Sequence, residues 1–129
     1  MPKLNVVDSS AWMEFFADGP NASAFAGAIQ DTARLVVPSI CLAEVFKSLL
    51  RQRGENDALQ GVALMQQGTV LDLDAPLALA AASLGVEHNL PLADSVVYAT
   101  GERVAGVVWT QDADFEGLPS VRYFPKKRK

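Results

Sequence analysis

The chain is 129 residues long and half of them are hydrophobic, which suits one compact domain and excludes a disordered protein. No apolar run approaches the roughly 20 residues that span a bilayer, and the start lacks the apolar stretch of a secretory signal, so we expect a cytoplasmic protein without a membrane segment. Residues 126–129 hold four of the 11 basic residues, which leaves 7 basic against 15 acidic residues in the body and a charge of −8.

Strand-like and helix-like segments alternate through the first half of the chain. Residues 4–7 are apolar and β-branched, which predicts a strand, and the hydroxyls of Ser9 and Ser10 can cap a helix that starts near Ala11. A Gly-Pro-Asn break at residues 19–21 ends that helix. The next predicted elements are a helix over residues 22–33, a buried strand over 35–38 and a long helix over 39–53.

The second half continues this alternation. Gly54 and Gly68 flank a predicted helix over residues 56–67. Because a parallel strand is reached only through a crossover connection, the alternation predicts an α/β fold: a three-layer α/β/α domain over residues 1–125 with a short, mostly parallel central sheet of four to five strands. The remaining predicted elements are a strand over residues 69–73, helices over 76–88 and 91–103, a strand over 106–110 and an edge strand over 121–124.

Acidic residues follow two of the predicted strands. Asp8 comes directly after residues 4–7, and Asp112 follows residues 106–110, with Asp114 two positions later. In open parallel sheets, ligands bind beyond the carboxyl ends of the strands. Each acid taken alone is equally well explained as a turn or helix cap, but two strand-end acids in one chain indicate a candidate site.

Asp94 lies near the start of the predicted helix over residues 91–103, where the helix macrodipole favours a carboxylate whatever its function. Its neighbours Leu92, Ala93 and Val96 are apolar, which suggests that the carboxylate is partly enclosed. A partly enclosed carboxylate favours a cation as partner.

Glu44 is a less obvious candidate. On a helical wheel of residues 39–53, Val45 belongs to the apolar stripe that faces the core. Glu44 lies on the other face, together with Lys47 and Arg51. The pattern alone therefore favours an exposed glutamate without a role. If Glu44 does reach the site, Lys47 and Arg51 form a basic strip beside it that could hold phosphate groups.

Other common catalytic sets are missing from the sequence. The single histidine, His88, falls at a predicted helix end and cannot form a catalytic histidine pair. No phosphate-binding loop, dinucleotide-binding glycine motif or Ser-His-Asp set is recognisable, and the lone Cys41 lies between apolar residues, where we expect it to pack in the core. Oxygen ligands remain, and these select hard cations such as Mg²⁺ or Mn²⁺.

Aspartate-phosphorylated receivers and phosphatases also carry acids at strand ends. The phosphatase motif needs a second aspartate two residues after the first, at the position that Ser10 occupies. A receiver needs a late lysine, but no lysine occurs between Lys47 and Lys126. Both classes therefore lack a required residue.

Four stretches of the chain resemble the motifs of the PIN-domain family, and in particular the small VapC-type toxin ribonucleases of toxin–antitoxin pairs. In the third stretch the family often has alanine where this chain has Ser95. Together the stretches extend over most of the chain: Val6-Val7-Asp8-Ser9-Ser10-Ala11, Pro38-Ser39-x-x-x-Ala43-Glu44-Val45, Leu90-Pro91-Leu92-Ala93-Asp94-Ser95 and Thr110-x-Asp112-x-Asp114-Phe115.

The resemblance implies a set of site residues. It places Glu44 with the catalytic acids, against the wheel, because helices of this family turn that acid toward the cleft. It also implies that Ser9, Ser10 and Thr110 orient a water or a phosphate, and it makes Lys47 and Arg51 candidate contacts to RNA phosphates. The implied catalytic acids are Asp8, Glu44, Asp94 and Asp112, and the implied metal ligands are Asp8, Asp94, Asp112 and the accessory Asp114.

The function implied by the resemblance is that of an endoribonuclease dependent on Mg²⁺, with Mn²⁺ as a substitute, which hydrolyses RNA with a metal-activated water. Such a protein is the toxin of a type II toxin–antitoxin pair, forms a homodimer, and is neutralised by a cognate antitoxin that lays a peptide across a hydrophobic groove. We expect DNA contact only through the antitoxin. The alternative is a catalytically silent PIN-like module that binds nucleic acid or a partner protein without cutting.

The basic tail at residues 126–129, with the sequence Lys-Lys-Arg-Lys, has two explanations. It is either a solvated, disordered end or a contact to phosphates. The acidic body would repel an anionic substrate unless cations or a basic strip reverse the local field.

Overall fold

The computed structural model describes residues 2–128 and has a five-stranded sheet at its centre. Its strand order is β3-β2-β1-β4-β5, and every pairing is parallel. The predicted α/β fold is therefore confirmed, with the sheet wholly rather than mostly parallel. The strands are β1 (Asn5–Val7), β2 (Leu35–Pro38), β3 (Thr69–Leu71), β4 (Val107–Thr110) and β5 (Val121–Tyr123).

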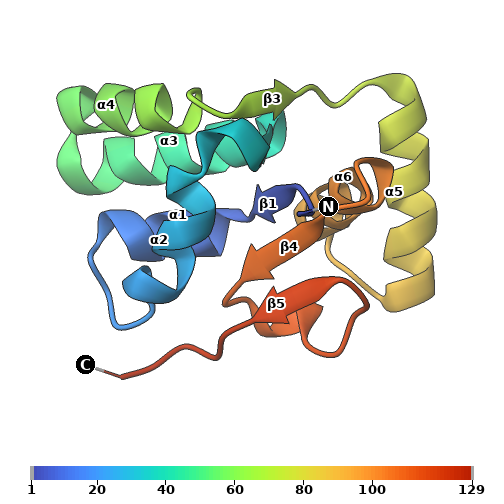
Figure 1. The fold of residues 1–129 in the computed structure, drawn as a ribbon. Coiled ribbons are helices and arrows are strands. Elements are labelled where there is room, and N and C mark those ends of the chain that lie inside the picture. Colours follow the sequence, from blue (N-terminus) through green and yellow to red (C-terminus); the bar gives the residue numbers. More distant parts are fainter. Residues whose placement is uncertain (1, 129) are drawn as a thin grey trace.

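Helices cover the sheet on both sides. Figure 1 shows α1 to α4 on one side and α5 with α6 on the other. The chain runs from β1 through β2 to β3 in one direction across the sheet and then returns to β4 on the other side of β1. Because each crossover is right-handed, the helices that connect β1, β2 and β3 lie on one face of the sheet and those that connect β3 to β4 lie on the other. The helices are α1 (Ser9–Phe16), α2 (Ala22–Gln30), α3 (Ser39–Arg53), α4 (Glu55–Met65), α5 (Ala75–His88) and α6 (Leu92–Arg103).

The strand order has a direct consequence for function. Connections leave in opposite directions from the neighbouring strands β1 and β4, which opens a crevice at their carboxyl ends. Asp8 follows β1 and Asp112 follows β4, so both lie at this point. The sheet therefore places the two predicted strand-end acids beside each other.

The core is built from the two central strands and the helices on either side. All residues of β2 are buried, and Val6 and Val7 of β1 have no exposed surface, as expected for parallel strands covered on both faces. Trp12 and Phe25 belong to the same buried cluster, from α1 and α2. Burial of apolar surface at about 25 cal/mol per Å² is the main stabilising contribution here.

The start of α1 differs from the prediction. The helix begins at Ser9 rather than near Ala11, and its cap is Asp8, whose side chain accepts a hydrogen bond from the Ala11 amide at 3.1 Å. The expectation that the serine hydroxyls cap the helix is wrong, because both hydroxyls donate to carboxylates instead: Ser10 donates to Asp8 and Ser9 to Glu44. The serine hydroxyls in the first turn of α1 therefore bind the carboxylates of Asp8 and Glu44.

Most other segments are shorter than predicted by one to three residues. The helix expected over residues 22–33 ends at Gln30 and continues as a short 3₁₀ turn, Thr32–Arg34, and the strand expected over 69–73 is Thr69–Leu71. Residues 72–73 leave the sheet because Asp74 already caps α5, with its side chain accepting from the Leu77 amide at 2.9 Å.

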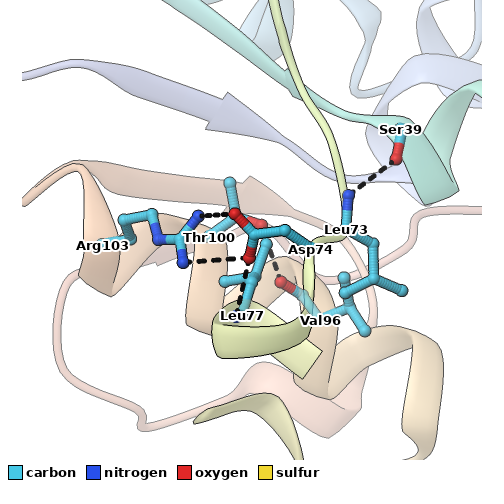
Figure 2. A network of polar contacts seen from close by, with 7 residues as sticks. All are labelled: Ser39, Leu73, Asp74, Leu77, Val96, Thr100 and Arg103. Atoms are coloured by element: carbon cyan, nitrogen blue, oxygen red, sulfur yellow. Dashed lines mark hydrogen bonds and ion pairs between the residues drawn. The ribbon is translucent and has the colours of Figure 1, made fainter. Parts of the chain in front are cut away.

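Asp74 also connects α5 to α6, the helix that carries Asp94. Figure 2 shows the Arg103 guanidinium donating to both oxygens of the Asp74 carboxylate, each at 3.1 Å. These hydrogen bonds lower the pKa of Asp74. In the same view, Ser39 at the start of α3 accepts from the Leu73 amide at 3.3 Å. Side chains from α3, α5 and α6 thus fix the segment between β3 and α5.

The chain ends outside the sheet. Residues 124–128 have no regular secondary structure, and residues 125–128 are exposed, whereas Lys129 of the predicted basic tail lies outside the described residues. Among the helices of residues 2–128, none has the length and apolar character needed to cross a bilayer.

Candidate metal centre

Three carboxylates converge beyond the carboxyl ends of β1 and β4. Asp94, Asp112 and Asp114 each offer an oxygen atom, and these atoms lie within 4.8 Å of one another. Asp94 comes from the first turn of α6, whereas Asp112 and Asp114 belong to the loop and 3₁₀ turn that follow β4. Residues from two distant parts of the chain therefore form one acidic cluster.

The cluster changes the ionisation of Asp94. Partial burial, followed by the negative charge of Asp112, raises the pKa of Asp94 to about 8. Two carboxylates at this range cannot both ionise without cost unless a cation neutralises them. Oxygen donors at mutual distances of this size suit a hard divalent cation such as Mg²⁺ or Mn²⁺. The residues therefore fit a metal ion of the predicted class.

Asp8 lies buried beside this cluster, with 3% of its surface exposed. Its Oδ1 accepts from the Ser10 hydroxyl at 2.7 Å and from the Ala11 amide at 3.1 Å, and its Oδ2 accepts from the Thr110 hydroxyl at 2.6 Å. Burial raises the pKa of Asp8, while the three hydrogen bonds oppose that shift and Asp112 adds to it. The charge of Asp112 therefore reaches Asp8 as well as Asp94.

The two hydroxyls also position the loop after β4. The backbone amide of Gln111 donates to Ser10 Oγ at 3.2 Å, and the backbone amide of Asp112 donates to Thr110 Oγ1 at 2.9 Å. A hydroxyl carries one hydrogen, and in each case that hydrogen points at Asp8. Asp8 thus orients Ser10 and Thr110, and these hydroxyls in turn fix the backbone that carries Asp112.

Glu44 lies outside the three-acid cluster but is connected to it through α1. Its side chain is exposed on α3, as the helical wheel predicts, and its Oε1 accepts from the Ser9 hydroxyl at 2.6 Å. Lys47 and Arg51 are exposed further along the same helix. Glu44 is therefore exposed on α3 and still contacts the first turn of α1.

A buried amide pair behind the site was not foreseen from the sequence. Asn21, with 2% of its surface exposed, donates from Nδ2 to Gln111 Oε1 at 3.1 Å and to the Pro125 carbonyl at 3.0 Å. Its backbone amide donates to Glu14 at 2.7 Å. The Gly-Pro-Asn break signals a turn, which explains Asn21 without a tertiary role, and no local pattern distinguishes Gln111.

Three other residues considered in the sequence lie away from the acids. The Ser95 hydroxyl donates to the Pro91 carbonyl at 2.9 Å. This hydrogen bond lies within the first turn of α6 and does not involve the acidic cluster. His88 pairs with Glu87 at 2.9 Å and packs edge-on against Tyr98. Cys41 is fully buried in the core, as expected, and burial raises the pKa of its thiol.

The model of one protein family, described as the PIN domain, matches residues 6–120. The chain belongs to the PIN-domain family. The match begins in β1 and ends just before β5, so it contains every acid of the candidate centre. Among curated proteins, no sequence matches this chain significantly.

Solved structures of VapC toxins and their complexes share this PIN fold. A chain of a toxin–antitoxin complex from Klebsiella pneumoniae matches with a TM-score of 0.81 at 17% identity, covering 95% of this chain and 99% of that one. VapC20 of Mycobacterium tuberculosis, a sarcin–ricin loop cleaving toxin, matches with a TM-score of 0.76 at 20% identity, covering 94% and 99%. The DNA-bound VapBC complex of Salmonella typhimurium gives 0.71 at 19% identity, covering 97% and 98%.

Proposed function

We propose that this PIN-domain protein is a metal-dependent endoribonuclease and the toxin of a type II toxin–antitoxin pair, with residues 1–125 as its nuclease domain. The observation that carries the proposal is the cluster of Asp94, Asp112 and Asp114 beyond the carboxyl ends of adjacent parallel strands. The sequence holds no histidine pair or nucleophilic triad to offer as an alternative catalyst.

In this proposal the cluster binds Mg²⁺, with Mn²⁺ as a substitute. Such cations supply a water nucleophile active at neutral pH and stabilise negative charge on the phosphate. Asp94, Asp112 and Asp114 provide oxygen ligands. A carboxylate has about four lone-pair positions, of which Asp8 already uses three, so Asp8 has one left for the same ion. The hydroxyls of Ser10 and Thr110 keep Asp8 and Asp112 in place.

Glu44 and its neighbours on α3 serve the substrate in this proposal. Ser9 restrains the exposed Glu44 carboxylate at the edge of the site, where Glu44 can accept a proton from the attacking water. Lys47 and Arg51 extend from Glu44 along the helix as phosphate contacts. Bound cations and this basic strip together offset the repulsion between an acidic body and RNA.

The choice of RNA as substrate rests on the fold and on the relatives that share it. The Mycobacterium tuberculosis protein of the same fold cleaves the sarcin–ricin loop, an RNA element. Structural matches to toxin–antitoxin complexes support a protein partner that neutralises the activity. These matches are the reason for proposing a cytoplasmic toxin rather than a nuclease of another pathway.

An apolar groove supports the antitoxin as a partner. It has a volume of about 260 Å³ and is bounded by α3 and α4. Ala43 of this groove directly precedes Glu44, so an apolar peptide seated there could extend a basic side chain toward the acids. The groove is lined by Leu42, Ala43, Phe46, Val62 and Gln66.

Exposed apolar residues on α5 and α6 support a homodimer. Leu79, Val86 and Leu92 are exposed by 72%, 87% and 74%, and α5 has no charged residue before Glu87. Apolar patches of this kind mark protein interfaces. Sedimentation velocity should detect a dimer, and a monomer at all concentrations would contradict this part of the proposal.

The test of the nuclease is cleavage of a generic RNA by antitoxin-free protein. We expect cleavage with Mg²⁺, none with EDTA, and a higher melting temperature with Mg²⁺, because a ligand at 100 times its dissociation constant stabilises the folded state by about 2.7 kcal/mol. A catalytically silent PIN module would bind RNA without cutting it under every metal condition. Absence of any Mg²⁺ effect on melting or cleavage would contradict the proposed centre.

A further inference from the structure

A hollow of about 430 Å³ opens beside Asp112. It shares Asp112 with the acidic cluster, and its far wall is the start of the basic tail. Its volume lies within the range of sites for small ligands, and its lining combines an acid, a cation and an aromatic ring. The hollow is lined by Gln111, Asp112, Ala113, Tyr123, Pro125 and Lys126.

One buried side chain fixes two walls of this hollow. Asn21 donates from its amide nitrogen both to Gln111 Oε1, at 3.1 Å, and to the Pro125 carbonyl, at 3.0 Å. Gln111 belongs to the loop that carries Asp112, whereas Pro125 immediately precedes Lys126. The first residue of the tail therefore leaves the fold at a defined place next to the acidic cluster, although residues 126–128 are exposed.

Strand alternation turns the Tyr123 side chain into the hollow. Successive residues of a strand point to opposite faces, and the Arg122 guanidinium lies over the Trp109 ring, 5.2 Å from its centroid. Tyr123 therefore points the other way, where it lines the hollow and is half-buried. A rigid aromatic ring and a lysine ammonium face the same space.

We propose that this hollow, which we call the tail subsite, binds one unpaired nucleotide next to the phosphate that is cut. The base stacks on Tyr123, and the phosphate of that nucleotide contacts Lys126. This inference rests on the proposed nuclease function and adds to it two substrate-binding residues, Tyr123 for an unpaired base and Lys126 for its phosphate.

The chemistry of the lining favours a nucleotide over a protein segment. A protein interface of this size would be more apolar at its centre and depleted in charge. The tail subsite instead has Lys126 at one end and Asp112 at the other, with Tyr123 between them. A cation and an aromatic ring in one groove are the features that proteins use for single-stranded nucleic acid.

The test compares four variants of the full chain on a fluorescent single-stranded RNA of mixed sequence, by cleavage kinetics and by fluorescence anisotropy in EDTA. Removal of one stacking interaction weakens binding about tenfold, so Tyr123→Leu should raise KM and the dissociation constant by that factor, while Tyr123→Phe keeps the ring and should stay within about twofold. Lys126→Gln should reduce the logarithmic slope of binding affinity against salt concentration by the amount expected for about one lost phosphate contact. Lys3→Gln, at the opposite end of the sheet, is the matched control and should change neither.

The outcomes separate this inference from the proposed function. If the wild-type protein cuts no RNA, the nuclease proposal fails, and anisotropy still tests the tail subsite. If the wild type cuts but Tyr123→Leu and Lys126→Gln keep its KM and salt dependence, the tail subsite is wrong. If these variants instead change self-association in sedimentation and leave RNA binding unchanged, the hollow is a protein interface and the inference is also wrong. Should Tyr123→Leu lower the melting temperature strongly, the salt dependence of Lys126→Gln decides.

Discussion

The Ser9 hydroxyl donates a hydrogen bond of 2.6 Å to Glu44 Oε1, although 35 residues separate the two. This contact joins the first turn of α1 to the exposed face of α3. It explains how a glutamate that the helical wheel places on the surface contacts the residue that directly follows Asp8. An exposed hydrogen bond contributes little to stability, so its value lies in where it holds the carboxylate.

Removal of that hydrogen bond should reduce activity more than stability. We expect Ser9→Ala to lower kcat/KM for RNA by about tenfold, because Glu44 loses its restraint, with a change in melting temperature close to zero. Ser23→Ala, an exposed serine on α2, is the matched control and should change neither quantity. Full activity of Ser9→Ala together with full activity of Glu44→Gln would show that Glu44 has no role in cleavage.

Asp94→Asn should abolish cleavage and raise the melting temperature of the metal-free protein, because it removes one of the repelling carboxylates. We expect a loss in kcat of at least about a hundredfold. Asp57→Asn, which alters an acid in the first turn of α4 rather than of α6, is the control for the helix macrodipole. Retention of activity by Asp94→Asn would contradict the metal centre.

Asp8→Asn should also abolish cleavage in a folded protein, but it is the less direct test. The amide nitrogen would replace one acceptor by a donor, so one of the hydroxyls of Ser10 and Thr110 would lose its partner. A moderate loss of stability is therefore expected for Asp8→Asn and not for Asp94→Asn, and thermal melting of both variants checks this difference.

The stability of the metal-free protein should fall as pH rises from about 4 to about 8. Folded Asp94 keeps its proton up to a pKa of about 8, whereas the unfolded chain releases it above 3.8. Between these values the folded state binds more protons, so each rise in pH favours unfolding. The raised pKa of Asp8 acts in the same direction. Melting curves in EDTA should show the fall in the wild type and a smaller one in Asp94→Asn; equal slopes would contradict the assignment to Asp94.

Thr110→Val should destabilise the protein by about 1–3 kcal/mol, because Asp8 loses a buried hydrogen bond and the Asp112 amide loses its acceptor. Thr110→Ser keeps the hydroxyl and should recover most of this loss. Urea unfolding of both variants measures the difference. If valine and serine destabilise equally, the cost comes from packing rather than from the hydrogen bonds.

Replacement of both Lys47 and Arg51 by alanine should weaken RNA binding and reduce its salt dependence. The logarithmic slope should fall by about 0.7 for each phosphate of a single strand that the variant no longer neutralises. Both side chains lie outside the acidic cluster, so Mg²⁺ affinity should stay nearly unchanged. Lys3→Ala is the control for a general loss of positive charge. A large loss of Mg²⁺ affinity in the double variant would show that these residues serve the metal site instead.

The order of the elements could be predicted because it depends on local signals. Gly54 ends α3 with a φ of 94°, which favours glycine, and Asn89 ends α5 in the left-handed conformation. The apolar runs of β1 and β2 are typical of strands covered on both faces. The helix start at Ser9 was missed because a first-turn serine can serve equally as a cap or as a donor to a distant acid. The Ser9 hydroxyl donates to Glu44 instead of capping the helix because α3 places Glu44 within hydrogen-bond distance, which no local sequence pattern predicts.

For the candidate site, the sequence by itself determined that Asp8 and Asp112 follow strands, and therefore that they lie at one edge of a parallel sheet. Tertiary structure decided which acids share a cluster: Asp94 and Asp114 join Asp112, Asp8 is buried beside them, and Glu44 accepts a hydrogen bond from Ser9. It also decided that Asn21 and Gln111 support the loop after β4. The physical reason is that strand ends are specified by neighbours in sequence, whereas carboxylate distances and buried amide pairs depend on how separate elements pack.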